Sequence, residues 1–126
     1  MRFYAPENPS HVSHSIVNLQ RTTNYFEADC QKLETGMRML GHVELSLLKL
    51  DVEGAEYEIL ASILNGHIRP TVLCMEFDEG YHPLDDEYLP RILNMVRQVK
   101  DCGYRLTYID GWNTTFVYES AVAGRL

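Results

Sequence analysis

The stretch LLKLDVEGAEYEIL, residues 47–60, changes its pattern at its centre. Residues 45–52 form a short, mostly apolar run, which is typical of a strand buried on both faces of a parallel sheet. After Gly54, apolar residues recur at the spacing of a helix. The stretch therefore predicts a strand, a tight turn that carries Asp51 and Glu53, and a helix.

Four later segments extend this pattern. The sequence predicts an apolar strand at 71–77, a helix at about 87–102, and two alternating strands at 104–109 and 114–118 that a short turn joins. Strand, helix, strand, helix and a terminal antiparallel pair together define the α/β class. We expect a mostly parallel sheet with one reversed strand at or near its edge.

The first third of the chain is less regular. Residues 1–24 are rich in loop-forming residues, with a short strand at 2–4, and a second strand is predicted at 25–28. Asp29 is predicted to cap a short helix that ends at Gly41. The chain is thus divided into a loop-rich lead-in (1–24), an α/β unit (25–120) and a tail (121–126).

Size and charge restrict the class of protein. The chain has 126 residues, a net charge of -7 and a pI of about 5.1, which suit one domain and argue against a nucleic-acid partner. It contains no apolar stretch long enough to span a membrane and no hydrophobic signal at its start. The cysteines Cys30, Cys74 and Cys102 are too widely spaced for a zinc knuckle, which favours reduced thiols and a cytoplasmic location.

Acidic residues follow both central strands of the predicted sheet. Asp51 and Glu53 end the first strand, and Glu76 and Asp78 end the second. Because functional crevices of such sheets lie beyond the carboxyl ends of the strands, we expect these four carboxylates, here called the acidic edge, to converge. Mutual repulsion should then raise the pKa of at least one of these carboxyl groups, or a cation should compensate their negative charge. Lys49, which is expected to be buried, is one candidate partner for Glu76.

Two further residues are placed beside the acidic edge. Trp112 lies in the turn between the last two strands and is predicted to form a wall of the crevice. His82 lies in a loop near it and could act as a base or contact a substrate. The simpler interpretation of Glu53 and Glu56 is that both are first-turn acids favoured by the helix dipole.

The residues LKLDVEGAE, 48–56, closely resemble the fourth-strand motif of FkbM-type methyltransferases, which reads roughly L-K-I/L-D-V/I-E-G-A/S-E. The segment YFEADCQKLETGMRML precedes this motif, and LCMEFDE, GYRL and DGWNTTFV follow it in the order of that family. The resemblance covers the chain from about Tyr25 to Val117.

This resemblance implies a class I, Rossmann-like fold with a seven-stranded sheet and methyl transfer from S-adenosylmethionine. The acceptor would be a hydroxyl oxygen of a sugar, glycan or small metabolite. By position, Asp51 and Glu53 would face the methyl donor and the acceptor, with Asp51 binding the donor. Glu76 would accept the proton of the attacking hydroxyl. From their predicted positions at the crevice, and not from the resemblance, Asp78, His82 and Trp112 are expected to contact the acceptor.

The first strand of the family and its glycine-rich donor loop have no counterpart in this sequence. We therefore expect the C-terminal half of the domain, which alone binds the donor weakly or not at all. Two alternatives remain open. One is a non-catalytic module that offers an open sheet edge to a partner chain. The other is a divalent-metal site built from the acidic edge.

Overall fold

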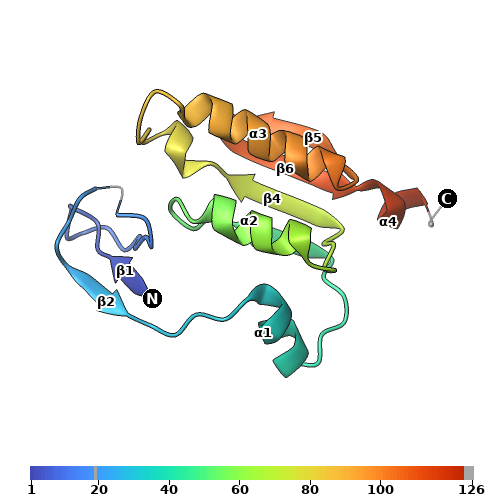
Figure 1. The fold of residues 1–126 in the computed structure, drawn as a ribbon, viewed down its shortest axis with the longest axis horizontal. Helices are drawn as coiled ribbons and strands as arrows, with labels where there is room; N and C mark the ends of the chain where they lie inside the picture. Colours follow the sequence, from blue (N-terminus) through green and yellow to red (C-terminus); the bar gives the residue numbers. More distant parts are fainter. Residues whose placement is uncertain (19, 124–126) are drawn as a thin grey trace.

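The structure, a computed structural model, describes residues 1–18 and 20–123 and contains a mixed four-stranded sheet. Its order is β3-β4-β6-β5 (Figure 1). The strands are β3 (Leu47–Leu50), β4 (Val72–Glu76), β5 (Tyr104–Asp110) and β6 (Asn113–Tyr118). Strands β3 and β4 are parallel, with Leu47 opposite Val72, whereas β6 is antiparallel to both β4 and β5.

The α/β class and the reversed strand near the sheet edge agree with the sequence. The expectation of a mostly parallel sheet is wrong for the pairings, because β6 lies between β4 and β5 and makes both of its pairings antiparallel. The two-residue turn Gly111–Trp112 folds β6 back beside β5, and β6, not β5, pairs with β4. Glu76 at the end of β4 is thereby placed opposite Asn113.

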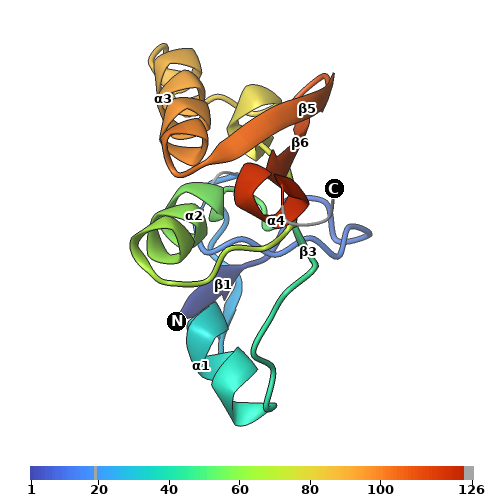
Figure 2. The ribbon, with the colours of Figure 1, turned by 90° about the vertical axis from the view of Figure 1, so that its right-hand side faces the viewer.

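Helices α2 (Glu56–Asn65) and α3 (Tyr88–Asp101) both pack on one face of the sheet (Figure 2). The core lies between them and the strands, and its least exposed members are Leu60, Leu73, Phe77, Val99 and Phe116. Strand β4 alternates between buried and partly exposed residues, which is the pattern of a strand with one covered face.

Strand β3 differs from the prediction of burial on both faces. Leu50 is buried, but Leu47 is 57% exposed and the side chain of Lys49 is 59% exposed. The physical reason is position: β3 forms the edge of the sheet, and α2 and α3 cover one face only. Apolar composition was therefore a poor guide to burial at this strand.

Helix α1 (Leu33–Met39) begins later than predicted. Its N-cap residue is Lys32, which makes no capping bond through its side chain, so the role given to Asp29 was wrong. The predicted end is confirmed, because Gly41 follows the helix with a φ of 72°. Met37 is the buried residue of this helix.

The first residues form a small sheet of their own. Strands β1 (Arg2–Tyr4) and β2 (Tyr25–Glu27) pair antiparallel, with Phe3 stacked on Phe26 at 5.1 Å between ring centroids. The connection between them reaches the main sheet, because the Ser15 hydroxyl donates a hydrogen bond to the backbone carbonyl of Glu53. In Figure 1 this unit lies beyond the end of β4 that carries its arrowhead.

Two further helical segments are short. The short 3₁₀ helix η1 (Asp78–Gly80) follows β4, and α4 (Glu119–Ala123) follows β6. Residues 124–126 of the predicted tail lie outside the described residues. The three cysteines are free thiols, and within the described part of the chain no helix has the length and apolar character that crossing a bilayer requires.

Candidate functional site

The predicted acidic edge forms where β3 and β4 end. Asp51 follows β3, Glu76 is the last residue of β4, and Asp78 begins η1. Partial burial raises the pKa of Glu76, and the nearby carboxylates of Asp51 and Asp78 raise it further. Because carboxylates influence one another in this way only at short range, the two strand ends bring their acids together.

Lys49 pairs with an acid of this cluster at the surface and not in the core. Its Nζ lies 2.6 Å from Asp51 Oδ2, and the predicted buried pairing with Glu76 is wrong. The cause is again the edge position of β3, which lets the side chain extend into solvent. Its charge still acts on Glu76 and opposes the rise of that pKa.

The turn between β3 and α2 has an unusual backbone. Glu53 has a φ of 53° and Gly54 a φ of 97°, so two consecutive residues are left-handed. Glycine tolerates this conformation, whereas a glutamate there costs of order 1–2 kcal/mol. Surrounding contacts hold the turn: Ser15 binds the carbonyl of Glu53, and the Gly54 N–H donates to Glu56 Oε1 at 3.0 Å.

Glu56 is a functional candidate that the sequence analysis assigned to the helix dipole. It begins α2 and has no exposed surface. Burial raises its pKa to about 7, and the neighbouring Asp78 contributes to the rise. A signal existed in the sequence, because Glu56 lies four residues before the core residue Leu60 and so on the same helix face.

Asp78 is buried as well, with 7% of its surface exposed. Burial raises its pKa, and the carboxylates of Glu53 and Asp51 act in the same direction. Glu56 Oε2 and Asp78 Oδ2 are both buried without a hydrogen-bond donor among the described residues. Buried polar atoms without hydrogen-bond partners are rare in folded proteins, so the two unpaired oxygens of Glu56 and Asp78 require an explanation.

A third buried acid next to the site is paired with a cation. Glu79 is 2% exposed and accepts hydrogen bonds from Arg91 Nε at 3.1 Å and from the Tyr57 hydroxyl at 2.7 Å. Arg91 binds Asp85 as well, at 2.7 Å, and its hydrogen bonds to Glu79 hold the pKa of Glu79 below its ordinary value. This network connects α2, η1 and α3 and was not predicted.

Trp112 and His82 both lie next to η1. A Cβ placed on Gly80 would stand 2.1 Å from Trp112 Cδ2, and the Trp112 ring meets that of Tyr88 edge-on at 6.1 Å. Trp112 is therefore packed against the helix turn that Asp78 begins. His82 is exposed, and its backbone N–H donates to the Asp78 carbonyl at 3.0 Å.

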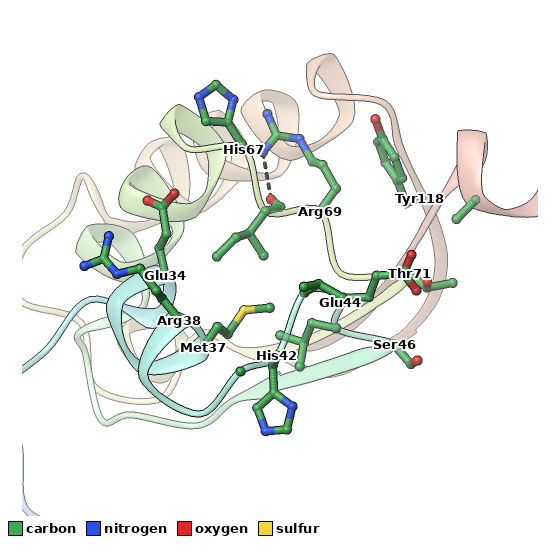
Figure 3. A pocket seen from close by; sticks show the side chains of 15 residues that line it. Glu34, Met37, Arg38, His42, Glu44, Ser46, His67, Arg69, Thr71 and Tyr118 are labelled. Atoms are coloured by element: carbon green, nitrogen blue, oxygen red, sulfur yellow. Dashed lines mark hydrogen bonds between the residues drawn. The ribbon is translucent and has the colours of Figure 1, made fainter.

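A cavity lies away from the acidic edge. It has a volume of about 780 Å³ and lies beside α1, lined among others by Met37, His42 and Tyr118 (Figure 3). It borders the residues that precede β3 and β4, at the opposite end of these strands from the acids. Arg69 also lines it, but its guanidinium donates to carbonyls at the end of α2, including that of Leu64 at 3.0 Å.

The described side chains do not form a set of ligands for a metal ion. Within residues 1–18 and 20–123, no three side chains of His, Cys, Asp or Glu are placed to hold a metal ion. Divalent cations such as Ca²⁺ take several oxygen ligands at once. The acidic edge is thus crowded without forming a metal cage.

An α/β domain with ionisable groups at the carboxyl ends of parallel strands has the architecture of a ligand-binding or catalytic domain. The profile of the methyltransferase FkbM domain matches residues 1–106, and the chain belongs to this methyltransferase family. The match starts before Tyr25, where the resemblance was expected to begin, and ends within β5. Neither the search of curated proteins nor that of solved structures found a match.

Proposed function

We propose that this chain supplies the acceptor side of an S-adenosylmethionine-dependent O-methyltransferase that acts on a hydroxyl of a sugar or small metabolite. The observation that carries the proposal is the acidic edge, which lies within the part of the chain that matches the family. We further propose that the glycine-rich donor loop is supplied from outside these 126 residues.

The charge of the acidic edge suits this donor. Asp51 and Asp78 raise the pKa of Glu76, Glu53 and Asp51 raise that of Asp78, and the charge of Lys49 opposes the rise at Glu76. S-adenosylmethionine, when bound, supplies a methyl group on a positively charged sulfonium. A negative site favours such a ligand electrostatically, and Asp51 at the end of β3 is the residue proposed to hold it.

Glu76 is the proposed base. Partial burial and the neighbouring acids raise its pKa, which makes its carboxylate a better proton acceptor. It would take the proton of the acceptor hydroxyl as that oxygen forms its new bond to carbon. Trp112, packed on η1, and the exposed His82 are the proposed contacts of the acceptor.

The open surface of the sheet supports the idea of a partial domain. Parallel strands are normally buried on both faces, yet β3 exposes Leu47 and has a neighbour, β4, on one side only. A further strand and covering helices would complete this sheet. The same open edge suits the alternative of a non-catalytic module that binds a partner strand.

Two measurements test the proposal. Calorimetric titration of the 126-residue chain with S-adenosylmethionine should give weak or undetectable binding; micromolar affinity would refute the missing donor loop. The gene should then be read upstream of Met1 for an in-frame strand and glycine-rich loop. If they are found, the protein that contains them should transfer a labelled methyl group to hydroxylated acceptors, and absence of transfer to sugars and small metabolites alike would refute the O-methyltransferase.

A further inference from the structure

The unpartnered oxygens of Glu56 and Asp78 identify a feature that goes beyond the proposed function. Glu56 begins α2 and Asp78 begins η1, so the two acids connect elements that follow β3 and β4. One oxygen of each is buried without a hydrogen-bond donor in the described chain. Two ionised carboxylates in such a place would repel each other without compensation.

We propose that Glu56 and Asp78 share one proton, and that this protonated pair is the positioning element that holds the Glu53–Gly54 turn at the acidic edge. A proton on Glu56 provides the donor that Asp78 Oδ2 lacks. The carboxylic acid–carboxylate pair then carries one negative charge in place of two. Both unpartnered oxygens are satisfied by the same hydrogen bond.

The turn is attached to both members of the pair. The Gly54 N–H donates to Glu56 Oε1 at 3.0 Å, and the backbone amide of Glu53 lies beside Asp78 and favours its ionised form. The contact between the two side chains raises the pKa of Glu56 and acts to lower that of Asp78, which puts the proton on Glu56 and the charge on Asp78. Because Glu53 and Gly54 are both left-handed, the turn depends on such contacts to keep its conformation.

The surroundings favour retention of the proton. Burial of Glu56 is the main cause of its raised pKa, while the Gly54 hydrogen bond acts in the opposite direction. The cations nearby are engaged, Lys49 with Asp51 and Arg91 with Glu79 and Asp85. The remaining ionisable groups around the pair are Glu53, Glu76 and Tyr57.

The sign of the pH dependence follows from the raised pKa. The folded protein keeps a proton on Glu56 that the unfolded chain releases near pH 4.5, so the pair stabilises the fold below that pH. This contribution is lost as the pH rises through about 7, where Glu56 ionises in the folded state. The turn should loosen over the same range.

A carbon-13 NMR titration of the 126-residue chain tests the shared proton directly. The side-chain carboxyl of Glu56 should titrate near neutrality, and Asp78→Asn should lower its midpoint. The amides of Glu53 and Gly54 should lose hydrogen-exchange protection, corrected for intrinsic exchange, with the same midpoint. A Glu56 midpoint near the ordinary 4.5 would overturn the proposal. So would hydrogen-exchange protection of the Glu53 and Gly54 amides that does not change as Glu56 ionises.

The variant Glu56→Gln provides a second test. Its amide donates to Asp78 and accepts from Gly54, so it mimics the permanently protonated state. Its melting temperature should lose the fall that the native chain shows between about pH 4.5 and about pH 7. Glu58→Gln, an exposed change on the same helix, should keep that fall. A pH dependence unchanged in Glu56→Gln would contradict the shared proton, and neither measurement depends on methyl transfer.

Discussion

The indole of Trp112 occupies the space next to Gly80 so closely that a Cβ on Gly80 would stand 2.1 Å from Trp112 Cδ2. This contact fixes the β5–β6 turn against η1. It also joins two parts of the site that are about 30 residues apart in sequence. The glycine is required for space, since its φ is not in the left-handed region.

Gly80→Ala should destabilise the fold by about 1–3 kcal/mol, the usual cost of forcing extra atoms into a packed site. Trp112 must move away from η1, and its fluorescence should change with it. Gly36→Ala is the matched control, because its Cβ would meet nothing within 4 Å and a helical alanine stabilises by about 0.5–1 kcal/mol. Denaturant unfolding followed by fluorescence compares the two, and equal stability of both variants would contradict the packing argument.

Arg91→Met should leave Glu79 buried without its cation. The loss of stability should be about 1–3 kcal/mol, typical of a buried acceptor that loses its donor, as measured by urea unfolding at neutral pH. Arg97→Met changes an exposed arginine of the same helix and should have little effect. Similar losses in both variants would mean that the Arg91 pairs contribute nothing specific.

Acid should remove the difference between native protein and Arg91→Met. The pKa of Glu79 is lowered, chiefly by its hydrogen bonds to Arg91, so the pair stabilises the fold above the unfolded pKa of about 4.5. This contribution is lost as the pH falls through the lower pKa of the folded state. Urea unfolding of both proteins over a range of pH should show the two stabilities converging in acid.

The order of elements was readable from the sequence because the patterns there are local. Residues 104–118 alternate around a short turn and form β5 and β6, and α3 agrees with its predicted bounds within a residue at each end. The convergence of acids at the ends of β3 and β4 follows from the geometry of parallel strands. Both inferences need only neighbouring residues and one topological rule.

What the sequence could not provide depends on distant partners. The exposure of Lys49 follows from β3 being an edge strand, which no local pattern reveals. The pairing of β1 with β2 spans a long connection, and the Glu79–Arg91 pair joins two elements. Glu56 does lie in the first turn of α2, but a first-turn acid is usually exposed, whereas Glu56 is fully buried, and no local pattern reveals that burial.

Glu76→Gln should lower methyl transfer by about 10²–10⁴-fold, the usual contribution of a general base, when this chain is assayed together with the proposed donor loop. The base must be ionised to accept a proton, so native activity should fall as the pH drops through the raised pKa of Glu76. The variant should lack this acidic limb. Glu58→Gln is the control, and a variant as active as the native protein would exclude Glu76 as the base.

Glu53 combines a strained backbone with a proposed role in the reaction, and two uncharged replacements separate these properties. Glu53→Asn and Glu53→Gln both remove the carboxylate, but asparagine tolerates the left-handed conformation better. The asparagine variant should therefore be more stable than the glutamine variant, by up to about 1 kcal/mol. Both should lose methyl transfer to the same extent. Equal stability in thermal unfolding would mean that the backbone at Glu53 stores no strain, whereas full activity of either variant would show that the carboxylate has no part in the reaction.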